Sequence, residues 1–301
     1  MVYTLTLNPA LDYVMKTGAL SFDNINRSKD ETLSYGGKGI NVSVILSCLG
    51  IENKALGFLA GFTGEQLEKM LISDGISCDF VYLESGNTRI NVKIRAEKEL
   101  DINADGPQIK EADIERLLEK LNCVKAGDFV VIAGALPENA PQNAYEIVLS
   151  RLEKRGVNFV VDATGDLLKS VLKYKPFLIK PNHLELGALF KADAETDEEI
   201  EEYARQLQAD GAKNVLVSRA EKGALLIDEN GGVSKIGAVT GELINSVGSG
   251  DSMVAGFIAG YIKTGSFEYA LKLGNACGAA TAFSPLLADK NKINELLNAV
   301  L

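Results

Sequence analysis

Residues 245–257 bring glycines and a carboxylate to the start of an apolar pattern. Gly248 and Gly250 flank Ser249, and Asp251 follows directly. Apolar residues then recur at helical spacing, at Val254, Phe257, Ile258, Tyr261 and Ile262. The glycines therefore lie where a helix begins, with unpaired N–H groups and a positive helix dipole, a setting typical of phosphate sites. Asp251 could remove a hydroxyl proton there while the N–H groups stabilise a moving phosphoryl group, so the segment predicts phosphoryl transfer. Helix capping alone is the simpler alternative.

A second glycine-rich loop, residues 35–42, precedes another apolar helical pattern. It is not a Walker A loop, because Gly39 rather than Ser or Thr follows Lys38. Glycine lets the backbone approach a ligand closely, Lys38 offers a positive charge, and Asn41 offers both a donor and an acceptor. The loop predicts a ligand contact, and a plain tight turn is the alternative.

Asn182 and Glu185 are three residues apart at the start of a predicted helix, so they share one face. Their oxygens could hold a magnesium ion through water, since that ion keeps several of its own waters. A capping box uses the same two residue types at the same spacing and is the competing explanation.

The composition narrows the class of protein. The 301-residue chain is 46% hydrophobic and 24% charged, which is ordinary for a globular chain with one large domain. A net charge of −10 argues against binding nucleic acid, so any anion site must depend on individual Lys and Arg near the glycines. Four scattered cysteines and one histidine, His183, argue against zinc and indicate a cytoplasmic protein. No stretch resembles a signal peptide or a membrane span, so no membrane partner is expected.

Strand and helix patterns alternate along most of the chain. Residues 2–7 predict a buried first strand, with Asp12 just beyond it, and strand patterns alternate with helical ones from about residue 110. Such alternation predicts a parallel sheet covered by helices on both faces, with ligands at the carboxyl ends of the strands. Gly134, Asp162 and Lys180 all follow predicted strands, and so does the loop before Gly248.

Residues 79–83 and 88–95 alternate polar and apolar side chains, with Ser85-Gly-Asn87 between them. This pattern predicts a two-stranded ribbon with a turn at residues 85–87. One face of the second strand is polar and mostly basic, because alternate positions hold Arg89, Asn91, Lys93 and Arg95. A solvated face would explain this pattern, but in so acidic a chain we expect Arg89 to face an anion.

Five motifs, in this order, resemble those of the ribokinase-like (phosphofructokinase-B) family of sugar kinases: Thr6-Leu-Asn-Pro-Ala-Leu-Asp12, Gly36-Gly-Lys-Gly-Ile-Asn41, Gly134-Ala-Leu-Pro137, Lys180-Pro-Asn-His-Leu-Glu185 and Val247-Gly-Ser-Gly-Asp-Ser252. The resemblance implies an α/β fold of three α/β/α layers with a mostly parallel sheet, in one kinase domain over residues 1–301. It also implies a small β lid from about residues 10–33 and 79–105. Relatives use such a lid in forming dimers, so a homodimer through the lid is expected.

The same resemblance implies roles for individual residues. Asp251 would be the base, and Gly248, Ser249 and Gly250 would form the anion hole. The sugar phosphate would contact Asp12, Gly36, Gly37, Lys38, Asn41, Arg89, Asn91 and Gly134, with its phosphate on Lys38 and Arg89. ATP would contact Lys180, Asn182, Ser218, Arg219, Ala220, Glu221, Lys222, Gly223, Gly250 and Asn275, and Asn182 and Glu185 would hold Mg²⁺ through water. Family members often have a glycine soon after the position of Ser218, whereas this chain has Arg219-Ala-Glu221.

Within the family, Thr88-Arg-Ile-Asn-Val-Lys93 resembles the branch that acts on fructose 1-phosphate. The expected reaction is therefore ATP-dependent phosphorylation of fructose 1-phosphate to fructose 1,6-bisphosphate. Tagatose 6-phosphate and fructose 6-phosphate are alternative substrates. A catalytically silent sugar-phosphate sensor is an alternative of another class, which the presence of Asp251 disfavours. A dinucleotide-binding enzyme is not favoured, because no Gly-x-Gly-x-x-Gly follows the first strand.

Overall fold

The computed structural model describes residues 1–300 and contains a central nine-stranded sheet and a smaller four-stranded sheet. The central strands lie in the order β13-β12-β11-β10-β9-β8-β1-β4-β5. All neighbours from β11 to β5 pair in parallel, and only β12 and β13 pair antiparallel, so the predicted α/β fold with a mostly parallel sheet is confirmed. The central strands are β1 Val2–Thr6, β4 Asn53–Leu59, β5 Val81–Tyr82, β8 Phe129–Ala133, β9 Asn158–Asp162, β10 Leu178–Ile179, β11 Asn214–Ser218, β12 Ala224–Ile227 and β13 Val233–Ile236.

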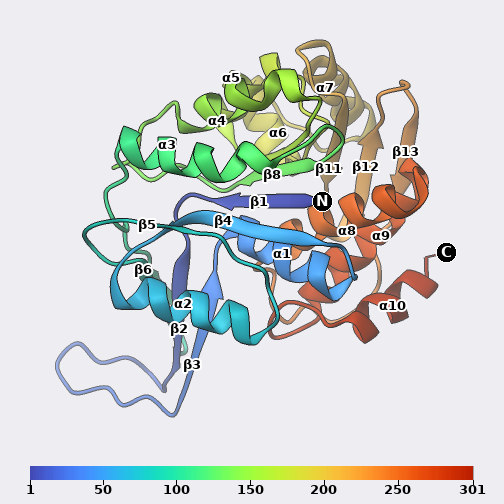
Figure 1. Cartoon of the computed structure of the whole chain (residues 1–301). Helices are drawn as coiled ribbons and strands as arrows, with labels where there is room; N and C mark the ends of the chain where they lie inside the picture. Colours follow the sequence, from blue (N-terminus) through green and yellow to red (C-terminus); the bar gives the residue numbers. More distant parts are fainter. Residues whose placement is uncertain (301) are drawn as a thin grey trace.

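Helices cover both faces of this sheet, which gives three layers (Figure 1). One face carries α3 to α7, and the other carries α1, α8, α9 and α10. None of the helices within residues 1–300 has the length and apolar character needed to cross a bilayer. The helices are α1 Lys38–Cys48, α2 Gly61–Ser73, α3 Glu111–Lys120, α4 Ala144–Leu152, α5 Gly165–Val171, α6 His183–Phe190, α7 Asp197–Ala209, α8 Ser249–Thr264, α9 Phe267–Ala282 and α10 Lys290–Asn298.

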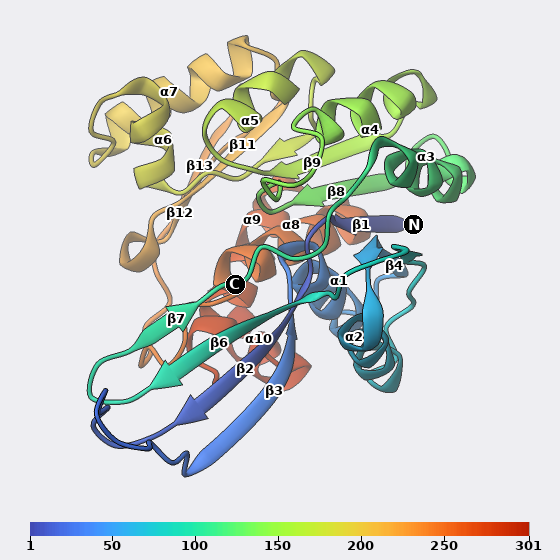
Figure 2. The same cartoon turned by 90° about the vertical axis from the view of Figure 1, so that its left-hand side faces the viewer.

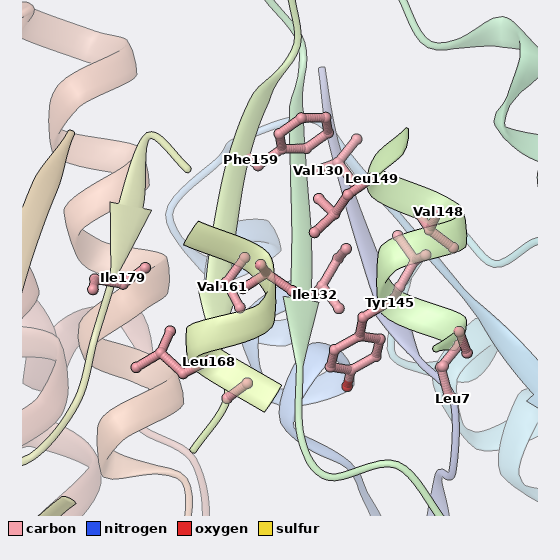
Figure 3. Close-up of a cluster of buried hydrophobic side chains, with 14 of the residues drawn as sticks. Leu7, Val130, Ile132, Tyr145, Val148, Leu149, Phe159, Val161, Leu168 and Ile179 are labelled. Atoms are coloured by element: carbon pink, nitrogen blue, oxygen red, sulfur yellow. The ribbon is translucent and has the colours of Figure 1, made fainter. Parts of the chain in front are cut away.

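The central strands are buried on both faces because successive side chains point to opposite helix layers. On β8, Val130 packs near Leu149 of α4 and Ile132 packs near Tyr145 of the same helix, as Figure 3 shows. Val131, between them, joins the cluster on the opposite face with α8 and α9. The apolar area removed from water on both faces makes this sheet the rigid part of the molecule.

Helices α8 and α9 pack unusually close together, and this contact fixes the position of the Asp251 segment. A Cβ atom at Gly256 would lie 2.7 Å from Cys277 Sγ and 2.9 Å from Gly274 Cα. Any larger side chain there would push the helices apart, so glycine is required by space. The Ser249 and Ser252 hydroxyls bond to Gly278 and Thr281 of α9, at 2.9 and 2.8 Å, which holds the first turn of α8 as well.

The smaller sheet has the strand order β3-β2-β6-β7 and extends beside the central sheet (Figure 2). Its strands are β2 Ala10–Lys16, β3 Asp30–Gly36, β6 Arg89–Arg95 and β7 Leu100–Ile102. The predicted ribbon of residues 79–83 and 88–95 is wrong, because β5 pairs with β4 in the central sheet while β6 pairs in parallel with β2. An alternating pattern predicts a strand but carries no information about its partner. The role of this sheet as a lid stays a prediction.

Candidate active site

A large cleft of about 1340 Å³ lies between the carboxyl ends of the central strands and the smaller sheet. Its walls include the ends of β1, β8, β9 and β11, the first turn of α8, and residues of β2 and β6. This is the edge at which ligands bind in parallel α/β sheets. Most of the predicted site residues line it: Asp12, Gly37, Lys38, Asn41, Arg89, Asn91, Gly134, Lys180, Asn182, Glu185, Ser218, Ala220, Glu221, Gly223, Gly248, Ser249, Gly250, Asp251 and Asn275.

Asp251 lies in the first turn of α8 and is 6% exposed. One of its oxygens, Oδ2, accepts a hydrogen bond of 2.8 Å from the Asn41 side-chain amide. Burial, and then the neighbouring Asp162 carboxylate, raise the pKa of Asp251 to about 6, although Asn41, Lys38 and Lys180 act in the opposite direction. A carboxylate with this pKa is ionised at neutral pH and yet is a better proton acceptor than an exposed one.

Backbone N–H groups are available beside this carboxylate. Gly248 caps α8 in the left-handed conformation, with φ of 80°, which favours glycine. The N–H of Ser249 bonds to the Ser246 carbonyl at 3.2 Å, but those of Gly248, Gly250 and Asp251 make no hydrogen bond within residues 1–300. These free donors at the positive end of the helix dipole suit an anion. The anion-hole role of Gly248, Ser249 and Gly250 stays a prediction, and the Ser249 N–H is already bonded within the turn.

Asp162, at the end of β9, forms ion pairs with two lysines that line the cleft. Its oxygens lie 3.1 Å from Lys38 Nζ and 3.5 Å from Lys180 Nζ. Burial alone would raise the pKa of Asp162, but Lys180 and Lys38 together hold it below its usual value. Lys180 Nζ also lies close to the start of α8, because a Cβ at Gly250 would be 3.2 Å away. The Lys38 and Lys180 ammonium groups thus both lie near the free N–H groups at the start of α8.

The smaller sheet supplies the opposite wall. Asp12 accepts hydrogen bonds from the Asn91 amide at 2.8 Å and from Lys93 Nζ at 2.6 Å, so both of its oxygens are engaged by β6. Arg89 lacks a carboxylate within ion-pair distance in residues 1–300, and its Nε is buried with no hydrogen-bond partner. Burial lowers the pKa of Arg89, which means that an added anion would stabilise its charge. The Gly36 backbone lies behind Asp12 rather than along the cleft, where a Cβ would meet that carboxylate at 3.1 Å.

Residues 218–223, at the end of β11, form a tight loop that lines another part of the cleft. Ala220 has a positive φ of 48°, which is a costly backbone conformation for any residue with a Cβ atom. Ala220 also lines the cleft. The Arg219 and Lys222 side chains lie outside the cleft lining. Arg219 is ion-paired with Asp197 at the start of α7 and donates to the Lys222 carbonyl at 3.1 Å, so it braces the loop from behind.

Asn182 and Glu185 form the capping box of α6. The Asn182 side chain accepts from the Glu185 N–H at 2.8 Å, and Glu185 Oε2 accepts from the Asn182 N–H at 2.9 Å. No cluster of three or more metal-ligating side chains occurs within residues 1–300. The side-chain oxygens of Asn182 and Glu185 still fit Mg²⁺, because both residues line the cleft. Mg²⁺ is usually held by one or two carboxylates together with water and phosphate oxygens. The metal-binding role therefore stays a prediction alongside the cap.

Residues 2–293 match the model of the pfkB family of carbohydrate kinases. The chain belongs to this family. It is 41% identical over 300 residues to a 1-phosphofructokinase of Bacillus subtilis and 37% identical over 301 residues to a D-tagatose-1-phosphate kinase of Bacillus licheniformis. Each alignment covers 100% of this chain and 98% of the relative.

The fold comparison agrees with the sequence comparison. The phosphofructokinase-2 of Escherichia coli, solved with substrates and products, superposes with a TM-score of 0.93 at 26% identity, covering 99% of each chain. This pfkB protein is thus an ATP-dependent sugar-phosphate kinase, as the sequence motifs indicated.

Several residues of this kinase cleft were not predicted as site residues. Asp162 pairs with Lys38 and Lys180, and Lys93 pairs with Asp12, and each of these pairs joins segments that are far apart in the sequence. The only signals for them in the sequence were a strand-end aspartate and a polar strand face. Apolar side chains around the loop before α8 also line the cleft, and their scattered positions carry no motif: Val239, Leu243, Val247 and Phe283.

Proposed function

We propose that this kinase phosphorylates fructose 1-phosphate at its 6-hydroxyl to give fructose 1,6-bisphosphate, with Asp251 as general base. The observation that carries the proposal is the pair of opposed features across one cleft. A buried carboxylate without a cation partner lies at the start of α8, and a half-buried guanidinium without a carboxylate partner, its Nε buried and unbonded, lies on the β6 wall. The first suits a hydroxyl that must lose a proton, and the second suits a phosphate already on the sugar.

In the proposed step the 6-hydroxyl transfers its proton to Asp251 as its oxygen attacks the γ-phosphorus of ATP. The new O–P bond forms as the bond from that phosphorus to the β,γ-bridging oxygen breaks, and ADP leaves. The backbone N–H groups of Gly248 and Gly250 and the Lys180 ammonium stabilise the charge on the moving phosphoryl group. Mg²⁺ bound near Asn182 and Glu185 would neutralise charge on the ATP phosphates. Closing the cleft with the smaller sheet would exclude water and limit ATP hydrolysis.

The identity of the sugar is supported by the relatives as well as by Arg89. One relative is named as a 1-phosphofructokinase and another as a D-tagatose-1-phosphate kinase. Both names refer to a ketose that carries its phosphate on C1. These two ketoses differ only in configuration at C4, so tagatose 1-phosphate is the second candidate. Tagatose 6-phosphate, fructose 6-phosphate and a silent sensor are further alternatives.

One set of rate measurements separates these candidates. Initial rates with MgATP should be compared for fructose 1-phosphate, tagatose 1-phosphate, fructose 6-phosphate, tagatose 6-phosphate and unphosphorylated fructose. We expect the highest kcat/KM for fructose 1-phosphate. A higher kcat/KM for either 6-phosphate would overturn the substrate proposal, and no turnover with any sugar phosphate would favour the sensor.

We also propose a homodimer through the smaller sheet. The Asp12 side chain points to one face of this sheet, and the reverse face is apolar. On that face the register places four side chains in one row across the strands: Leu33, Tyr13, Val92 and Ile102. Ile102 is 54% exposed. An apolar sheet face of this kind suits a second copy of the same sheet. Light scattering coupled to size exclusion should give a dimer mass that Ile102→Lys reduces, while a monomeric wild-type protein would contradict this assembly.

A further inference from the structure

The Asn41 side chain lies deeper in the site than a sugar contact alone requires. It is 9% exposed, in the first turn of α1, and its Nδ2 is 2.8 Å from Asp251 Oδ2. A Cβ added at Gly248 would be 3.4 Å from the same Nδ2. The amide is thus packed between the cap of α8 and the carboxylate beyond it, on a contact that joins residues 210 positions apart.

We propose that Asn41 is a positioning residue for Asp251, which orients the carboxylate toward the cleft and keeps it ionised. The inference rests on the proposed function of Asp251 as base. Since Asp251 Oδ2 accepts the amide hydrogen bond, the other oxygen, Oδ1, is left to receive the substrate proton. Asn41 was expected from the sequence only as a sugar contact, and the two roles can be separated by experiment.

The group that donates to Asp251 is a neutral amide rather than a cation, and this difference has a physical consequence. The charged groups that face Asp251 are Lys38 from α1, Asp162 from β9 and Lys180 beyond β10, while α9 contributes the uncharged Gly278 and Thr281 to the same turn. Lys38 and Lys180 are already engaged with Asp162. A third cation bonded directly to Asp251 would lower its basicity, whereas an amide favours the ionised form less strongly.

The test is the pH dependence of kcat/KM for wild type and for variants of Asn41. Wild type should lose activity as the pH falls through about 6, the pKa of Asp251. Asn41→Ala removes a hydrogen bond to the ionised carboxylate, so the acid limb should move up by about one pH unit or more. Asn41→Asp has nearly the same shape but replaces the donor with a carboxylate, so the limb should move further in the same direction.

Asn53→Ala is the matched control. Asn53 is also a buried amide, bonded to Ser47 Oγ at 2.8 Å, but it lies outside the cleft, so its loss should leave the limb in place. If Asn41→Ala does not fold by circular dichroism, Asn41→Ser serves in its place, with a smaller upward shift expected. A limb that stays at the wild-type pH while KM for the sugar phosphate rises would overturn the proposal and leave Asn41 as a substrate contact. Failure of the proposed function is distinguishable, because Asp251→Asn would then retain its rate.

Discussion

The two ends of the cleft leave opposite charges without a partner. At the α8 end, the buried Asp251 carboxylate is bonded to an amide, while the nearby lysines are engaged with Asp162. At the β6 end, the Asp12 carboxylate is bonded to Lys93, while the half-buried Arg89 has no carboxylate partner within residues 1–300. This difference supports the proposal that the first end accepts a proton and the second binds an anion.

The comparison teaches that neighbours, more than burial, decide what a charged group can do. Asp162 and Asp251 are both almost fully buried, yet two lysines hold the pKa of Asp162 below its usual value, whereas the pKa of Asp251 is raised to about 6. Burial disfavours the charged form of each carboxylate, and at Asp162 the two lysines outweigh that effect. An unpaired group is costly to bury, so the free groups at both ends point to ligands.

The largest effect should come from removing the free carboxylate. Asp251→Asn keeps the shape of the side chain but not its basicity, so turnover should fall by about 10²–10⁴-fold. Binding of the sugar phosphate, measured by calorimetry, should be largely retained because Arg89 is unchanged. A variant that keeps more than about a tenth of the wild-type rate would remove Asp251 from the role of base.

Removing the free guanidinium should be the next largest effect, and it should appear in a different constant. Arg89→Ala is expected to raise KM for fructose 1-phosphate by roughly ten- to a hundredfold through lost charged hydrogen bonds. KM for ATP should hardly change. Arg89→Lys should restore little, because a lysine cannot form the two parallel bonds that arginine makes with phosphate. Loss of ATP affinity instead would contradict the placement of the phosphate at this end.

The cost of burying Asp251 should appear as stability that depends on pH. Its pKa is raised from 3.8 to about 6 by folding, so the native state binds a proton more tightly than the unfolded chain between these values. Stability contributed by this proton is present at low pH and is lost as pH rises through about 6. Asp251→Asn should therefore be more stable than wild type at pH values well above that pKa, by about 2–3 kcal/mol. Denaturant unfolding at several pH values tests this, and a difference that does not shrink toward acidic pH would contradict it.

The smallest effect should come from Glu185, which lines the cleft and already serves the α6 cap. Glu185→Gln should raise the magnesium concentration needed for half-maximal rate by several fold, since a carboxylate near metal-bound water becomes neutral. The glutamine can still accept the Asn182 N–H, so stability should change little. If melting temperature falls while the magnesium requirement stays constant, capping is the only role of this residue.

Local features of the fold and site were predictable from the sequence. The glycines before Asp251, the capping pair Asn182 and Glu185, and the alternation of strands and helices each depend on residues within one or two turns. The chemistry of Asp251 and Lys38 could be inferred because residue type and the start of a helix are both visible along the chain. The polar strand face in so acidic a chain indicated Arg89 as an anion contact, and the resemblance to sugar kinases implied that this anion is the phosphate of the sugar.

Tertiary structure alone decided which charges meet. Asn41 reaches Asp251 across 210 positions of sequence, Lys38 reaches Asp162 across 124, and Lys93 reaches Asp12 across 81. The partner of β5 was decided in the same way, because an alternating pattern fits either sheet. The interaction of two charges weakens with the distance between them, so which carboxylate is left unpaired depends on distances that only the packed strands and helices create.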